Sequence, residues 1–105
     1  MVDVVKDNLD KTIEACKQMQ VKSLYLFGSG SRTNGFDQNK SDLDFIFQFV
    51  NGRDGLPVAG YDYFDLLFAL EEITGKKVDL VAEERISNKY FLESINKDKI
   101  RIYEA

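Results

Sequence analysis

The sequence predicts an α/β fold, of the α+β kind, in which a small mixed β-sheet is flanked by helices. Three apolar runs of strand length, at residues 21–27, 43–50 and 78–81, are separated by segments whose apolar residues recur at helical spacing. The chain has 105 residues, is 44% hydrophobic and contains one proline, which suits one compact domain with a modest core. We therefore expect residues 1–105 to form a single domain.

The first element is a predicted amphipathic helix over residues 3–20. Asp3 is available as its N-cap. Because Cys16 lies on the apolar stripe and is the only cysteine, we expect it to be a buried structural thiol. The stripe is expected to pack on the sheet through Val5, Leu9, Ile13, Cys16 and Met19.

Two strands follow, over residues 21–27 and 43–50. Side chains alternate in a strand, so the second strand has one apolar face and one face that begins with Asp42 and Asp44. That second face continues into Ile46 and Val50, which indicates a strand covered on both sides with its carboxylates at the solvated end. The apolar face consists of Leu43, Phe45, Phe47 and Phe49.

The second half of the chain predicts a helix, a strand, a helix and a last strand or extended tail. A turn-rich connection over residues 51–60 leads to a helix that begins near Tyr61 and stops at Gly75, with Asp62 and Asp65 as helix-start residues. Its expected core side is Phe64, Leu67, Phe68 and Ile73. The strand over residues 78–81 carries Asp79, and a last strand or extended tail is expected over residues 100–103. The last helix, over residues 85–96, is expected to contact the core through Ile86, Tyr90, Phe91 and Ile95.

The turn after the first strand suits a phosphate group. It reads Gly28-Ser29-Gly30-Ser31-Arg32, and two glycines among hydroxyl residues allow positive φ angles and close backbone approach. Successive N–H groups in such a turn are able to point at an anion. Most Gly-Ser turns between strands bind nothing, so this pattern alone leaves a plain turn open.

Asp42 and Asp44 suit a metal ion. Two carboxylates one pleat apart repel each other, and near a partly buried sheet end a cation relieves that repulsion. Mg²⁺ takes oxygen ligands, retains waters and bridges carboxylates to substrate phosphates. An Asp-x-Asp is more often a solvated strand face, but its occurrence after a glycine-rich turn, between apolar strands, favours a metal-nucleotide site.

The composition excludes several classes of function. The formal charge of −4 argues against direct DNA or RNA binding, which needs clustered Lys and Arg. Histidine is absent, which excludes a Ser-His hydrolase arrangement and His-based zinc sites. No apolar run approaches the length of a membrane span, and the start is unlike a signal peptide, so we expect a cytoplasmic protein without membrane contact.

These motifs resemble a known family signature. Gly28 with Ser29, Arg32 four residues after the glycine, and the run Ser41-Asp42-Leu43-Asp44 at the start of an apolar strand resemble the polymerase-beta-like nucleotidyltransferase superfamily. The branch it most resembles is the minimal nucleotidyltransferase (MNT) domain of bacteria and archaea. Thr33 stands where that family commonly has a glycine.

The resemblance implies a fold and a set of roles. Asp79 would lie on a strand beside Asp42 and Asp44 and complete a carboxylate triad that is catalytic and holds one or two Mg²⁺ ions. Gly28, Ser29 and Arg32 would bind the nucleoside triphosphate, with ATP as the expected substrate.

The resemblance also implies a partner. MNT proteins are typically antitoxins paired with a HEPN ribonuclease toxin, and some transfer AMP from ATP to a tyrosine of that toxin. Two other functions stay open: a small-molecule, antibiotic-type nucleotidyltransferase, and a non-catalytic antitoxin that inhibits its partner by binding. A homo- or hetero-oligomer is compatible with all three.

Overall fold

The computed structural model describes residues 1–28, 42–51 and 61–105. In these ranges the strands predicted around residues 21–27, 43–50 and 78–81 are confirmed, and the last residues form a fourth strand. The elements in chain order are α1 (Asp3–Lys6), α2 (Leu9–Gln18), β1 (Val21–Phe27), β2 (Leu43–Phe49), α3 (Tyr63–Thr74), β3 (Val78–Ala82), the 3-10 turn η2 (Glu83–Arg85), α4 (Lys89–Asp98) and β4 (Ile100–Glu104).

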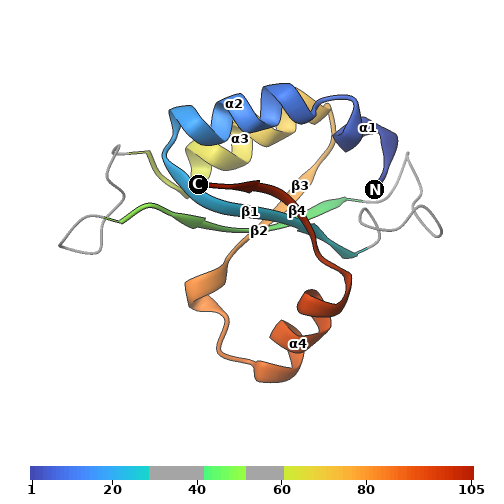
Figure 1. Cartoon of the computed structure of the whole chain (residues 1–105), viewed down its shortest axis with the longest axis vertical. Coiled ribbons are helices and arrows are strands. Elements are labelled where there is room, and N and C mark those ends of the chain that lie inside the picture. The colour runs from blue at the N-terminus through green and yellow to red at the C-terminus, as the bar shows by residue number, and fades with distance from the viewer. Residues whose placement is uncertain (29–41, 52–60) are drawn as a thin grey trace.

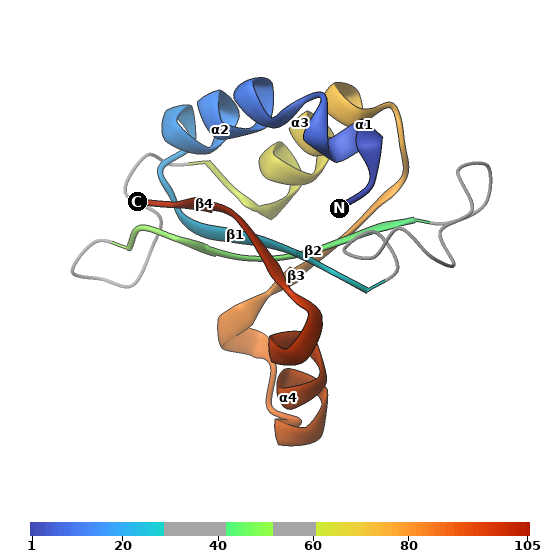
Figure 2. The same ribbon diagram turned by 45° about the vertical axis from the view of Figure 1, so that its right-hand side comes forward.

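The strands form one mixed sheet in the order β3-β2-β1-β4 (Figure 1). β1 is antiparallel to both β2 and β4, whereas β2 and β3 are parallel. Helices α1, α2 and α3 cover one face of the sheet, and α4 lies on the other face (Figures 1 and 2). This arrangement confirms the predicted mixed sheet flanked by helices.

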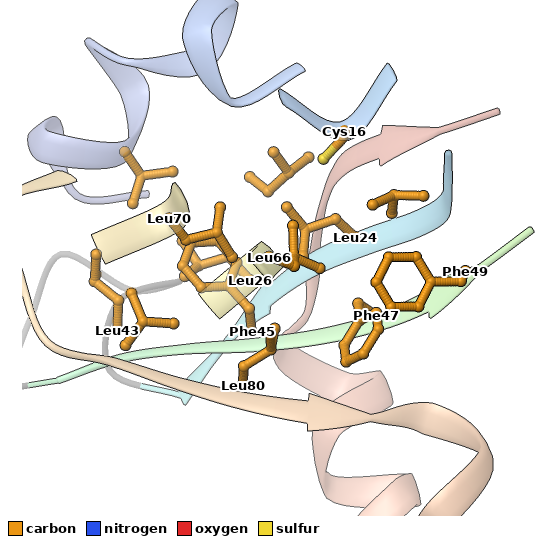
Figure 3. Close-up of a cluster of buried hydrophobic side chains, with 14 of the residues drawn as sticks. Cys16, Leu24, Leu26, Leu43, Phe45, Phe47, Phe49, Leu66, Leu70 and Leu80 are labelled. Atoms are coloured by element: carbon orange, nitrogen blue, oxygen red, sulfur yellow. The ribbon is translucent and has the colours of Figure 1, made fainter. Parts of the chain in front are cut away.

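The main core lies between the sheet and the helices α2 and α3 (Figure 3). Leu24 and Leu26 of β1 and Phe45 of β2 are fully buried there, as is Cys16 of α2. Burial raises the pKa of the Cys16 thiol to about 12, so the thiol is an inert core group, as predicted. Within the described residues, no helix combines the length and the apolar character that a bilayer crossing requires.

The prediction of one continuous helix over residues 3–20 is wrong. The segment forms two helices, and Asp3 is the first residue of α1 while Val2 occupies the N-cap position. The break falls at Asn8, whose side-chain Nδ2 donates to the carbonyl of Val4 at 2.7 Å and so competes with regular helix bonding. The buried residues after the break are Thr12 and Cys16.

The ends of α3 match the prediction, but its predicted core side is right only in part, because Leu67 packs against the core whereas Phe64 and Phe68 are exposed. Asp62 and Asp65 form a reciprocal capping box at the start, and Gly75 ends the helix in the left-handed conformation. Phe64 and Phe68 are 58% and 61% exposed. Apolar residues surround nearly the whole helix, so the helical period could not select the face that is buried, which is Leu66, Leu70 and Thr74.

The last helix begins later than predicted. Asn88 is its N-cap and accepts hydrogen bonds from the backbone N–H groups of Tyr90 (2.9 Å) and Phe91 (3.1 Å), while the expected start at Arg85 belongs to η2. The later start changes which side chains face the sheet. Ile95 is buried as expected, but Tyr90 and Phe91 are 78% and 44% exposed and are not core residues.

Candidate functional site

The register of β2 and β3 brings two predicted site residues together. Asp44 lies directly beside Asp79 in the parallel pair, and Asp42 precedes Asp44 by two residues and so shares its face. A hydrogen bond of 3.0 Å from the Leu43 N–H to the Lys77 carbonyl joins the two strands at this end. The strand adjacency expected from the family resemblance is therefore confirmed, with Asp42 and Asp44 half-buried and Asp79 exposed.

The surroundings of Asp44 raise its pKa. Burial raises its pKa from 3.8 to about 6, and repulsion from Asp79 and Asp42 adds to the rise. This repulsion follows from the strand register, which places Asp79 directly beside Asp44. When Asp44 is ionised, its negative charge is poorly solvated and lies near two other carboxylates. A cation bound there would be favoured.

Gly28 lies against the same carboxylate. It follows β1 with a φ angle of +70°, and a Cβ at this position would collide with Oδ2 of Asp44. The preceding residue, Phe27, pairs with Asp44 across the antiparallel strands. Glycine is therefore required at position 28 both for its backbone angle and for the space that Asp44 occupies.

The rest of the predicted phosphate-binding turn lies outside the described residues. This applies to Ser29 and Arg32, and to Thr33 and the connector up to Ser41. Their nucleotide-binding roles stay predictions.

The donor set fits Mg²⁺ rather than a closed protein cage. In the described ranges, no group of three acidic, histidine or cysteine side chains is arranged to hold a metal ion by itself. Mg²⁺ usually takes only one or two carboxylates and keeps waters and substrate phosphate oxygens as its other ligands. Asp44, with Asp42 or Asp79 beside it, supplies such an open set of oxygen ligands.

An aromatic pair borders the carboxylates on the α4 side. The ring of Phe91 meets that of Phe27 at a centroid distance of 6.3 Å and an interplanar angle of 86°. Phe91 was predicted to be a core residue, and Phe27 was not predicted to lie at the site. Asn88, three residues before Phe91, is the signal that would have placed Phe91 in the first turn of α4.

A pocket of about 530 Å³ lies at the other end of β2. Phe47, Phe49 and Tyr63 line it, and none of the three aspartates does. Its walls are mainly apolar, whereas the chemistry of nucleotidyl transfer needs charged oxygen ligands. The carboxylate end of β2 and β3 is thus the candidate active site on chemical grounds.

The sequence profile of the family described as "Polymerase beta, Nucleotidyltransferase" matches residues 10–105. The chain belongs to this family of nucleotidyltransferases. The match includes β1, Gly28 and all three aspartates, and so contains the candidate site. Family membership agrees with the resemblance seen in the motifs, and the four-stranded mixed sheet agrees with the expected fold.

Relatives of this nucleotidyltransferase have been found by sequence and by structure. A Methanocaldococcus jannaschii protein named "Putative protein adenylyltransferase" is 34% identical over 102 residues, which cover 96% of this chain and 97% of the relative. A solved structure described as a "putative minimal nucleotidyltransferase" aligns with a TM-score of 0.69 and 24% identity, over 94% of this chain and 95% of its own.

A third similarity is to a complex. The structure of a tri-AMPylated Shewanella oneidensis HEPN toxin with an MNT antitoxin aligns with a TM-score of 0.60 and 18% identity, over 95% of this chain and 72% of the matched one. At this identity the likeness concerns the fold alone.

Proposed function

We propose that this nucleotidyltransferase is the antitoxin of a HEPN toxin and that it transfers AMP from ATP to a tyrosine of that toxin. The observation that carries the proposal is the register pair of Asp44 and Asp79, with Gly28 packed against Asp44. The M. jannaschii relative, which has nearly the same length and is named for protein adenylylation, supports the choice of a protein acceptor. The similar fold of an MNT antitoxin in complex with an AMPylated HEPN toxin supports the choice of partner.

The reaction needs a nucleophile, a leaving group and a proton acceptor. The tyrosine oxygen attacks the α-phosphorus of ATP, the bond from that phosphorus to the oxygen bridging to the β-phosphate breaks, and pyrophosphate leaves. The hydroxyl proton passes to a protein carboxylate, because the chain has no histidine to accept it. Asp79 suits this role because it is the exposed member of the three and so is open to an approaching side chain.

Asp42 and Asp44 are assigned to the metal-bound triphosphate. When bound, Mg²⁺ neutralises charge on the phosphate oxygens and on the departing pyrophosphate. The residues of this chain orient the substrate: the Gly28 backbone comes close to Asp44, and Ser29 and Arg32 are proposed to contact the outer phosphates.

The test is intact-mass analysis of the HEPN-type partner after incubation with this protein, ATP and Mg²⁺. We expect the wild type to add mass in adenylyl units and Asp44→Asn to add none. Glu14→Gln serves as the matched control, because it removes one exposed carboxylate from α2, on the other face of the sheet. Tyr→Phe substitutions in the partner then identify the acceptor residue.

Two outcomes would contradict the proposal. A partner that stays unmodified but is bound and inhibited equally by the wild type and by Asp44→Asn would identify an antitoxin that acts by binding. Release of pyrophosphate that depends on a small hydroxylated compound, with no mass added to the partner, would identify a small-molecule nucleotidyltransferase.

A further inference from the structure

An aromatic side chain lies directly beside the candidate metal ligand. Phe27 is opposite Asp44 in the antiparallel pair of β1 and β2. Residues paired in this way project from the same face of a sheet, so the Phe27 ring and the Asp44 carboxylate are neighbours. The face is the one that carries α4, since Phe91 of α4 contacts Phe27 (Figures 1 and 2).

Phe27 and Phe91 together form a corner. Their rings stand almost perpendicular, at 86°, so a flat group stacked on one ring presents its edge to the other. Phe27 is half-buried and Phe91 is 44% exposed, so the corner is not closed off by other side chains. Single exposed aromatics are common on protein surfaces, and it is the position beside Asp44 and Gly28 that distinguishes this pair.

We propose that the nucleobase of the nucleoside triphosphate stacks on Phe91, with Phe27 supporting that ring from the side. This inference rests on the proposed function, because it takes the triphosphate to lie at Asp44 and Gly28. The ribose separates the base from the α-phosphate, so the base must lie a few ångströms beyond the carboxylates. The ring centroid of Phe91 lies 6.3 Å from that of Phe27, which is paired with Asp44 across the strands.

The other exposed aromatic residues of the described chain fit this role less well. Tyr90 adjoins Phe91 in the sequence, but successive residues of a helix point about 100° apart, and Tyr90 is 78% exposed. Phe64 and Phe68 contact each other in a tilted arrangement on α3, which covers the opposite face of the sheet (Figure 1). The Phe91 ring, by contrast, contacts Phe27, which is paired with Asp44 across the strands.

The test separates the base from the phosphates. Binding of Mg·ATP and of Mg·tripolyphosphate, which has no base, is measured by calorimetry for the wild type, Phe91→Ala and Tyr90→Ala. Aromatic stacking predicts that Phe91→Ala weakens ATP binding by about 10-fold or more, with tripolyphosphate binding unchanged. Tyr90→Ala, the matched control on the same helix turn, should bind both ligands as the wild type does.

A second variant gives a direct signal. The chain contains no tryptophan, so Phe91→Trp introduces a single tryptophan, at the proposed stacking surface. We expect this variant to keep ATP affinity, and its fluorescence to change with ATP and not with tripolyphosphate. Retained binding by Phe91→Trp also shows that the helix tolerates substitution at this position.

Three results would overturn the inference. Equal weakening of both ligands in Phe91→Ala would mean that the ring supports the fold rather than the base. Unchanged ATP affinity in Phe91→Ala, with tripolyphosphate still bound, would reject stacking but leave the triphosphate site intact. A wild type that binds neither ligand would reject the nucleotide site itself, and with it the proposed function.

Discussion

Replacing Asp44 by asparagine should stabilise the fold at neutral pH while it abolishes transfer. The substitution keeps the shape of the side chain and removes a partly buried charge, which Asp79 and Asp42 also repel. Asparagine is nearly the same size as aspartate, so its side chain still fits the space beside Gly28. A gain in stability with a loss of activity is typical of a residue kept for its chemistry.

The size and sign of the effect follow from the pKa of Asp44. A rise from 3.8 to about 6 corresponds to about 3 kcal/mol at 1.36 kcal/mol per pKa unit. Because Asp44 is only half-buried, solvent screening reduces this, and we expect about 1–2 kcal/mol. The folded state holds the Asp44 proton more tightly than the unfolded state does, so the protonated carboxyl stabilises the fold relative to the charged one. This stabilisation is full below pH 3.8 and is lost as the pH rises through about 6.

Urea unfolding in EDTA, at pH 5 and at pH 7.5, measures the free energy of unfolding of both proteins. Asp44→Asn should exceed the wild type by about 1–2 kcal/mol at pH 7.5, with a smaller gap at pH 5. Glu14→Gln, on an exposed position of α2, should change little at either pH. Added Mg²⁺ should stabilise the wild type more than Asp44→Asn, because it binds the folded carboxylates.

The reasoning would be refuted by an Asp44→Asn protein that is no more stable than the wild type at pH 7.5. It would be refuted equally by a stability gap that does not shrink on acidification, since the cost of burying the Asp44 charge and its repulsion by Asp79 and Asp42 both disappear when Asp44 is protonated.

Further predictions concern the positions around the site and the core. Gly28→Ala should cost about 1–3 kcal/mol by urea unfolding, because of the collision with Asp44 and the positive φ angle, and a neutral result would contradict that packing. Leu70→Ala should cost about 2–5 kcal/mol, whereas Phe68→Ala, two positions away but exposed, should cost less than about 1 kcal/mol; equal costs would contradict the assigned helix face. The Cys16 thiol should resist Ellman's reagent in the native protein and react after unfolding, and rapid native labelling would show that it is accessible.

The strands were predictable because their pattern admits one assignment. In β2 the alternation of Leu43, Asp44 and Phe45 distinguishes two faces without any tertiary information, and the structure buries Leu43 and Phe45 fully. The faces of the helices were not predictable in the same way. Phe64 and Phe68 of α3 are as apolar as the residues that are buried, and only the position of the sheet decides between the two sides.

The site was predictable in part. Asp42 and Asp44 fall together by strand period alone, but no spacing in the sequence places Asp79 beside Asp44, because the parallel pairing of β2 and β3 is a property of the topology. The family resemblance supplied that pairing. The contact between Phe91 and Phe27 depended on where α4 begins, and an error of four residues at the helix start, from 85 to 89, concealed it.

The position of the carboxylates is fixed by the same pattern that builds the core. Asp44 lies between Leu43 and Phe45, both fully buried on the side of α2 and α3. A slip of β2 by one residue would put Asp44 into that core and bring both apolar side chains to the other face, at a cost that no local rearrangement offsets. Burial of Leu43 and Phe45 therefore holds Asp44 against Gly28 and beside Asp79, and the energy that orients the candidate site comes from the opposite face of the sheet.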